Sequence, residues 1–250
     1  MESSSAPLAG KAALITGGSR GIGAAIARRL AHDGADVAIT FASAQSKADD
    51  VVRAVEATGR RGVALHAEAA DPAAVREAVA KTVAAFGRLD VLVNNAGIAT
   101  MAPLEQFSLE DFDRMVAVNV RAAFVATQAA APHMAAGGRV IMIGSVNADR
   151  MPFAGGAVYA MTKAAIAGLT RGLARDLGPR EITVNAVQPG PVDTDMNPAS
   201  GPFSEGLKAM MALKRYGTAD EIAGLVAYLA SPIAGYVTGA AFTIDGGFDA

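Results

Sequence analysis

Short apolar runs alternate with amphipathic stretches along almost the whole chain, and this alternation constrains the fold more than any other feature. Continuous apolar runs are typical of strands in a parallel sheet that is covered on both faces. Strands that alternate with helices are joined by right-handed crossovers, which wind helices onto both faces of the sheet. We therefore predict an α/β fold with a doubly wound parallel sheet of about seven strands. The predicted strands are residues 11–16, 36–41, 62–67, 89–93, 139–144, 183–188 and 240–244.

Local signals mark the ends of the helices between these strands. Asp71-Pro72 places an N-cap residue and a first-turn proline at one helix start, and Gly87 marks its end. Ser108 and Asp111 form a capping-box-like start of a long helix. The other predicted helices are residues 22–33, 46–58, 157–177 and 219–230. No linker, repeat or low-complexity tract interrupts the pattern, so we expect a single domain over residues 1–250, with an irregular segment at 190–216.

Composition and charge exclude several classes of protein. The 250 residues are 52% hydrophobic, so the chain can bury a full core. With 22 basic and 24 acidic residues the net charge is −2, which argues against binding of a nucleic acid polymer through its phosphates. The absence of cysteine excludes disulfides and thiolate chemistry. The three histidines, His32, His66 and His133, are too scattered to form a ligand pair, so we expect no metal site.

One uncharged stretch, residues 222–244, is long enough to cross a membrane. Ser231-Pro232 and Gly235 interrupt it, and proline ends helices. We interpret the stretch as a buried helix, a turn and a buried strand. The first residues, Met-Glu-Ser-Ser-Ser-Ala-Pro, also lack the pattern of a secretory signal. We therefore expect a soluble cytoplasmic protein without a membrane partner.

Between the first predicted strand and helix lies a glycine-rich loop, residues 16–23 (Thr-Gly-Gly-Ser-Arg-Gly-Ile-Gly). Glycines at positions 17, 21 and 23 let the backbone turn sharply and approach a ligand closely. The following helix N-terminus offers free N–H groups and a positive dipole end to a pyrophosphate. A tight glycine turn without a ligand is the alternative. The position between strand and helix favours a dinucleotide-binding Rossmann fold.

Arg20 lies inside this loop, where a positive charge has little structural use. Enzymes that prefer NAD normally carry an acid at the end of the second strand to bind the ribose hydroxyl, and residues 39–43 (Ile-Thr-Phe-Ala-Ser) contain none. Both features favour the 2′-phosphate of NADP. The alternative is that Arg20 is a solvated surface charge.

Tyr159 is the one tyrosine that has a lysine four residues later, Lys163, within a predicted helix. That spacing puts both side chains on one face. A phenol ordinarily ionises far above neutral pH, and an adjacent ammonium stabilises its charged form. Such a pair suits proton transfer during carbonyl reduction. An ordinary helix-face pair is the alternative explanation for the two residues taken alone.

Other polar or small residues follow neighbouring strands, at the edge where open α/β sheets bind ligands. Ser145 follows the fifth strand, residues 94–97 (Asn-Asn-Ala-Gly) follow the fourth, and Pro189-Gly190 follow the sixth. Asn119 lies in the middle of a predicted helix among apolar residues, where its amide needs partners. It is either a hydrogen-bonded core residue or an anchor for a water near Lys163.

Together these segments, with the closing Asp245-Gly246-Gly247, resemble the short-chain dehydrogenase/reductase family almost from end to end, including 3-oxoacyl-carrier-protein reductases. The resemblance implies Tyr159 as acid-base catalyst, Lys163 as its partner and ribose ligand, Ser145 as substrate-orienting residue, and Asn119 as holder of a relay water. It implies an NADP(H) site and a homotetramer or dimer with two long helices at the interface. The usual adenine-contacting Asp is replaced by Glu68. The cofactor contacts it implies are Gly17, Ser19, Arg20, Gly21, Ile22, Gly23, Ala42, Ser43, Glu68, Ala69, Asn95, Ala96, Gly97, Tyr159, Lys163, Pro189, Gly190, Val192 and Thr194.

Residues 143–152 and 187–198 resemble more narrowly a bacterial subgroup described as cyclic-di-GMP-binding biofilm dispersal mediators. Two hypotheses follow. The main one is an NADPH-dependent carbonyl reductase acting on a small ketone or alcohol, with residues 190–216 as a lid lined by Met196, Phe203, Met210 and Met211. The alternative is a regulatory protein that binds a cyclic dinucleotide and promotes biofilm dispersal. That role predicts an arginine cluster, for which Arg150, Arg171, Arg175 and Arg180 are the candidates.

Overall fold

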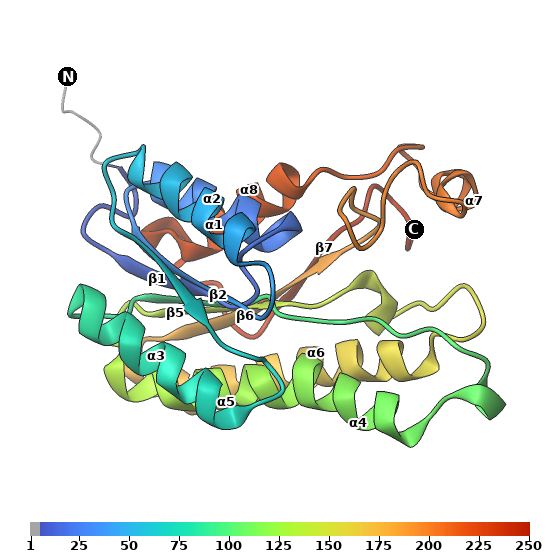
Figure 1. Ribbon diagram of the computed structural model, residues 1–250, viewed down its shortest axis with the longest axis horizontal. Helices are drawn as coiled ribbons and strands as arrows, with labels where there is room; N and C mark the ends of the chain where they lie inside the picture. The colour runs from blue at the N-terminus through green and yellow to red at the C-terminus, as the bar shows by residue number, and fades with distance from the viewer. Residues whose placement is uncertain (1–5) are drawn as a thin grey trace.

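The computed structural model describes residues 6–250, and within them seven strands form one parallel sheet in the order β3-β2-β1-β4-β5-β6-β7 (Figure 1). The order reverses between β1 and β4, because β1 pairs with β2 on one side and β4 on the other. The strands are β1 (Ala12–Ile15), β2 (Asp36–Phe41), β3 (Gly62–His66), β4 (Val91–Asn94), β5 (Arg139–Ile143), β6 (Thr183–Pro189) and β7 (Ala241–Ile244).

Helices cover both faces of this sheet (Figure 1). Helices α1, α2 and α8 lie on one face, and α3, α4, α5 and α6 lie on the other, while α7 lies beyond the sheet near the C-terminus. The doubly wound Rossmann fold predicted from the sequence is confirmed. The helices are α1 (Gly21–His32), α2 (Gln45–Glu56), α3 (Pro72–Phe86), α4 (Leu109–Val116), α5 (Ala122–Ala130), α6 (Ala157–Leu177), α7 (Ser204–Met210) and α8 (Ala219–Ala230).

The apolar core consists of two layers, one on each face of the sheet. Along β1, Ala13 and Ile15 pack with α1, α2 and α8, whereas Ala12 and Leu14 pack on the opposite side with α3 and α5. Successive strand residues point to opposite faces, so a strand buried on both sides must be apolar throughout. This explains the continuous apolar runs, and it fixes the strand ends that carry the site.

Most element boundaries agree with the sequence prediction, including the Asp71 cap and the long helix that starts after Ser108. Three predictions were wrong in part. The irregular segment 190–216 contains helix α7. The long helix is interrupted by a π-turn at Ala117–Arg121. The last strand, β7, is not buried, because it is an edge strand that pairs with β6 alone and exposes alternate residues.

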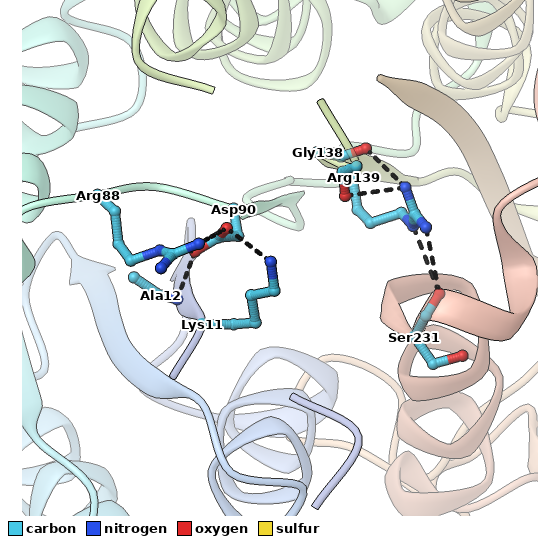
Figure 2. A network of polar contacts seen from close by, with 8 residues as sticks. Lys11, Ala12, Arg88, Asp90, Gly138, Arg139 and Ser231 are labelled. Carbon is cyan, nitrogen blue, oxygen red and sulfur yellow. Dashed lines mark hydrogen bonds and ion pairs between the residues drawn. The ribbon is translucent and has the colours of Figure 1, made fainter. Parts of the chain in front are cut away.

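A buried carboxylate ties β1 to β4 at the edge of the sheet opposite the ligand-binding edge (Figure 2). Asp90 accepts hydrogen bonds from the main-chain N–H of Ala12 at 3.0 Å and from the guanidinium of Arg88 at 2.7 Å, and Lys11 lies 3.3 Å away. Burial alone would raise the pKa of Asp90. The bonds from Arg88 and Ala12 and the charge of Lys11 outweigh burial, so this pKa lies below its ordinary value.

At the same edge, the Arg139 guanidinium is almost fully buried and donates to the main-chain oxygens of Gly137 and Gly138, at 2.9 and 3.1 Å (Figure 2). It also donates to the carbonyl of Ser231, at the C-terminus of α8, from 3.4 Å. A cation at a helix C-terminus is favoured by the helix dipole. Burial lowers the pKa of Arg139. These contacts join the start of β5 to the C-terminal end of α8.

No helix within residues 6–250 is long and apolar enough to cross a membrane. Across the same residues, no group of three or more acidic or histidine side chains is arranged to hold a metal ion.

Candidate active site

The predicted site residues gather at the carboxyl edge of the sheet, around the point between β1 and β4 where the strand order reverses. In open α/β sheets the crevice at such a reversal is the usual place for a ligand. The glycine-rich loop follows β1, residues 95–97 follow β4, and Ser145 follows β5. Sequence elements more than a hundred residues apart thus meet at one edge.

The glycine loop adopts a conformation that side chains would obstruct. Gly17 and Gly21 have positive φ values of 63° and 54°, which L-residues rarely adopt. A Cβ on Gly17 would lie 3.0 Å from the Cα of Ala96, and one on Gly23 would lie 2.5 Å from the Asn95 side chain. The loop is also tied to β2, because the N–H of Gly17 donates to the Thr40 hydroxyl at 3.0 Å.

Helix α1 begins at this loop without a side-chain cap. Its N-cap residue is Arg20, whose side chain makes no capping hydrogen bond. The first N–H groups of a helix have no acceptor within the helix, so those of Gly21, Ile22 and Gly23 need one from outside. An uncapped N-terminus beside a glycine turn fits a pyrophosphate group, which supplies acceptor oxygens and negative charge.

Asn95 braces the loop from the neighbouring strand. Its amide donates to the main-chain oxygens of Thr16 and Gly17, each at 2.9 Å, while the Thr16 hydroxyl accepts from the N–H groups of Asn95 and Ala96, each at 3.0 Å. The Asn95 side chain is therefore occupied by the protein itself. The Asn95 side-chain nitrogen holds the carbonyls of Thr16 and Gly17 in place, and the contact of Asn95 with a cofactor stays a prediction.

Lys163 and Tyr159 lie one turn apart on α6, as the sequence predicts. The Lys163 side chain is buried, 6% exposed, and its ammonium donates to the main-chain oxygen of Ile143 at 3.1 Å. The same nitrogen lies 5.6 Å from the centre of the Tyr159 ring. An ammonium has three protons, so Lys163 keeps donors for a ligand or for the phenol after binding Ile143.

Ser145 caps the short 3₁₀ turn η4 (Val146–Ala148) at the end of β5. Its hydroxyl accepts from the main-chain N–H of Asn147 at 3.1 Å and donates to the Asn147 side-chain oxygen at 3.3 Å. The Asn147 amide also donates to the carbonyl of Arg150 at 2.9 Å. Asn147 was missed in the sequence. The available signal was an asparagine two residues after a serine at a strand end, a common capping pattern.

Asn119 lies in the π-turn at Ala117–Arg121, where the helix N–H of Ala122 bonds five residues back to Ala117. Its side chain accepts from the N–H of Ile98 and donates to the Ile98 carbonyl, both at 2.9 Å, and it donates to the Thr162 hydroxyl at 3.1 Å. Single π-turns inside α-helices are frequent at functional sites. The Asn119 side chain is thus a hydrogen-bonded core group, and it joins the loop after β4 to α6 beside Lys163. Its role as an anchor for a water stays a prediction.

Gly97 occupies the space between Asn119 and Lys163. A Cβ there would lie 3.5 Å from the Asn119 side-chain oxygen and 3.6 Å from the Lys163 ammonium. With glycine at position 97, no side chain fills the space next to the Lys163 ammonium. This supports a site in which the ammonium faces a ligand.

The predicted adenosine contacts lie around the ends of β2 and β3. Ala42 and Ser43 follow β2 and are exposed, and Ala69 lines a small apolar cavity together with Thr16 and Thr40. Glu68 is exposed, and its carbonyl accepts from the N–H of Asp71, at the start of α3.

Phe41 ends β2 and is buried, 5% exposed, with its ring edge against His66 at a centroid distance of 5.5 Å. The last residue of β2 therefore belongs to the core. The exposed residues that directly follow this strand are Ala42 and Ser43.

Beyond β6, the chain crosses the same edge. Gly190 approaches Asp245 so closely that a Cβ would lie 2.6 Å from the Asp245 Cα. Thr194 lies over the glycine loop, 3.4 Å from where a Cβ of Gly21 would be. Val192 is buried and pairs with Gly217.

Within the segment 190–216, Met196, Phe203 and Met210 are exposed, as expected for an apolar lining. Met211 is not part of that lining. It is buried with Val146, Tyr216 and Phe248 in a small cluster that anchors the segment next to η4.

Comparisons with known proteins agree with this arrangement. A family profile described as Enoyl-(Acyl carrier protein) reductase matches residues 17–249. A relative from Escherichia coli strain K12, named cyclic-di-GMP-binding biofilm dispersal mediator protein, is 50% identical over 241 residues, which are 96% of this chain and 98% of that protein.

Two solved structures are similar over nearly their whole length. A short-chain dehydrogenase/reductase from Serratia marcescens BCRC 10948 is 59% identical, with a TM-score of 0.96, over 98% of this chain and 100% of the other. A short chain dehydrogenase from Burkholderia cenocepacia J2315, solved in complex with NADP, is 55% identical, with a TM-score of 0.97, over 98% and 100% of the two chains.

Proposed function

The chain belongs to the short-chain dehydrogenase/reductase family, and on that premise we propose that it is an NADPH-dependent carbonyl reductase. The observation that carries the proposal is the buried Lys163 ammonium, which uses one proton on Ile143 and lies beside the Tyr159 ring with Gly97 leaving its front open. A binding site alone has no need of a buried cation beside a phenol. Carbonyl reduction needs both a proton donor and a group that stabilises the phenolate.

The cofactor we propose is NADP(H). The uncapped N-terminus of α1 and the glycine loop would hold its pyrophosphate, and Arg20, Ala42 and Ser43 would surround its 2′-phosphate. The Burkholderia cenocepacia relative, which binds NADP in its crystal structure, supports this choice. When bound, NADPH supplies the hydride that reduces the carbonyl carbon.

The chain's own residues would carry the proton and the positioning. The Tyr159 hydroxyl gives its proton to the carbonyl oxygen, and the Lys163 ammonium stabilises the phenolate that remains. The Ser145 hydroxyl would donate a hydrogen bond to the same carbonyl oxygen. The substrate oxygen then replaces the Asn147 side-chain oxygen, which accepts this hydrogen bond in the structure. Met196, Phe203 and Met210 form the exposed apolar side of the segment 190–216, which favours an apolar ketone or aldehyde.

The direct test is a panel of carbonyl compounds, aliphatic, aromatic and cyclic, followed through the loss of NADPH absorbance. We expect turnover with apolar ketones. NADPH binding without turnover of any compound in a broad panel would contradict the proposal.

The second candidate function is binding of cyclic-di-GMP, which the name of the Escherichia coli relative favours. Arg150 and Arg180, two of the four arginines predicted to form a cluster, do not lie together. Arg150 donates to the carbonyl of Phe248, and Arg180 donates to those of Ala131 and Met134. The 21-residue helix α6, about 30 Å long, lies between these two arginines. Calorimetric titration with cyclic-di-GMP, with and without NADPH, would measure this binding directly.

We also propose that the chain assembles as a homotetramer through the outer face of α4, α5 and α6. Leu109, Phe124 and Met161 lie on these helices and are exposed, with Phe124 44% exposed. Exposed large apolar side chains on helices of the same layer favour association. Light scattering of the parent protein and of Phe124→Glu measures the assembly, and we expect the variant to dissociate.

A further inference from the structure

Two cations occupy the first residues of two helices beside the glycine loop. Arg20 is the exposed N-cap of α1, and Lys47 is the third residue of α2, whose first turn contains no acidic residue. A helix N-terminus carries partial positive charge, so a cation there is disfavoured. A negative charge close to both N-termini would offset this unfavourable placement of two cations.

Asp195, from the segment 190–216, supplies such a charge. Its carboxylate lies 2.6 Å from the Lys47 ammonium, although the two residues are 148 positions apart. The hydrogen bond and charge of Lys47, with a further contribution from Arg20, hold the pKa of Asp195 below its ordinary value. Its neighbour Thr194 lies over Gly21. Asp195 therefore lies above the glycine loop, near the N-termini of both helices.

The ion pair between Lys47 and Asp195 is half exposed on both sides. Exposed pairs contribute little to stability, because water and salt screen them. This contact is therefore weak enough to be exchanged for a stronger anion. A phosphate carries nearly two negative charges and three acceptor oxygens, so it outcompetes one carboxylate for a lysine and an arginine.

We propose that Asp195 competes with the 2′-phosphate of the cofactor for Lys47 and Arg20, so that Lys47 strengthens and Asp195 weakens the preference for NADP(H) over NAD(H). The inference rests on the proposed function, because it requires the adenosine ribose to lie beside Ala42 and Ser43. These residues follow β2 directly, and Lys47 lies four positions after Ser43, in the first turn of α2. An acid on the segment that covers the site thus sets part of the cofactor specificity.

The experiment measures dissociation constants of NADPH and NADH, by fluorescence of the bound nicotinamide, for the parent, Lys47→Gln, Asp195→Asn and the double variant at low salt. We expect Lys47→Gln to weaken NADPH about fivefold, which is the scale of one exposed charge contact. Asp195→Asn should tighten NADPH about threefold by the same arithmetic. NADH should change less than twofold throughout, since it has no phosphate at this position.

The matched control is Lys208→Gln, which breaks the Lys208–Glu205 pair on α7, 2.7 Å long, and should change neither constant. The opposite signs of the two variants are the decisive result. If Asp195→Asn weakens both cofactors alike, the pair only holds the segment in place and the inference is wrong. If the parent binds both cofactors but Lys47→Gln changes nothing, the inference fails while the proposed function stands. If the parent binds neither cofactor, both fail.

Discussion

The Ser145 hydroxyl and the Asn147 side chain hydrogen-bond to each other at 3.3 Å, at the end of β5. The main-chain N–H of Asn147 donates back to the same hydroxyl at 3.1 Å. The serine proposed to orient the substrate is thus itself oriented by the residue two positions later. Asn147 also reaches the Arg150 carbonyl, so it fixes the whole turn that follows the strand.

We expect Asn147→Ala to lower kcat/KM about tenfold, because the turn that carries Ser145 loses the bond from Asn147 to the Arg150 carbonyl, and Ser145 loses its acceptor before the substrate binds. The cofactor dissociation constant should not change, because Asn147 is a positioning residue that acts through Ser145. The deciding measurement is a double-mutant cycle. In a Ser145→Ala background, Asn147→Ala should have little further effect. Additive losses would show that Asn147 acts independently of Ser145.

Tyr159→Phe should keep cofactor binding and remove most turnover. The ring packs as before, and the change deletes the phenolic oxygen together with the proton that the carbonyl oxygen needs. Fluorescence titration with NADPH and steady-state turnover with a substrate of the parent enzyme separate the two effects. Turnover near that of the parent would refute the role assigned to Tyr159.

Arg20→Ala should weaken NADPH by roughly tenfold at low salt and leave NADH nearly unchanged. A guanidinium bonded to a phosphate contributes about 1.5–3 kcal/mol, and exposure at the cleft rim favours the lower end. Ratios of kcat/KM for the two cofactors measure the change. Equal weakening of both cofactors would mean that Arg20 supports the loop's shape.

An acid placed after β2 should reverse the cofactor preference, provided that it is placed at an exposed position. Ala42→Asp is the suitable variant, because its carboxylate would repel the 2′-phosphate and accept from a ribose hydroxyl. Phe41→Asp would instead bury a carboxylate in the core beside His66 and destabilise the protein. Thermal unfolding of both variants, measured with their cofactor ratios, distinguishes a change of specificity from a loss of fold.

Asp90→Asn should lower the free energy of unfolding by about 1–2 kcal/mol at neutral pH, since it weakens charge-assisted bonds to Arg88 and Ala12. The pKa of Asp90 is lower in the folded chain than in the unfolded chain, where it is about 3.9. The contribution of the Asp90 carboxylate to the free energy of unfolding is therefore complete above the pKa of the unfolded chain. It is lost as the pH falls through the lower pKa that Asp90 has in the folded chain.

Urea unfolding of the parent and Asp90→Asn from pH 7 down to about pH 3, at one protein concentration, should show the difference between them shrinking with acid. Asp50→Asn is the control, because Asp50 pairs with Arg53 on the exposed surface of α2 and should matter little. A difference that stays constant across this range would contradict the assignment.

The fold was predictable because burial on both faces leaves a strong signal in the sequence. β2 and α6 have the same bounds in the prediction and in the structure. The Asp71 cap was also predictable, since a cap depends on neighbours in sequence. The site residues at the ends of β1, β4 and β5 could be grouped from the topology alone, because parallel strands end at one edge.

Features that depend on distant contacts could not be predicted. The exposure of β7 depends on which strand ends the sheet, and the burial of Met211 depends on Phe248. Helix α7 lies between prolines and glycines that indicate irregular structure. The orientation of Phe41 toward His66 follows from the pairing of β2 with β3. Each of these needs the tertiary structure, which local propensity does not encode.

The π-turn at Ala117–Arg121 has a consequence for insertions and deletions in this chain. In a π-turn the N–H bonds to the carbonyl five residues earlier, and in an α-helix to the carbonyl four residues earlier. The long helix therefore contains one residue more than a regular α-helix of the same length. Deleting one residue from the turn should leave the apolar faces of α4 and α5 in register and give a straighter helix. The Asn119 amide would then no longer reach Ile98 and Thr162. A shortened chain of this kind should still fold, at some cost in stability from the lost Asn119 bonds, and should lose catalytic activity. The site therefore depends on the extra residue, and the fold does not.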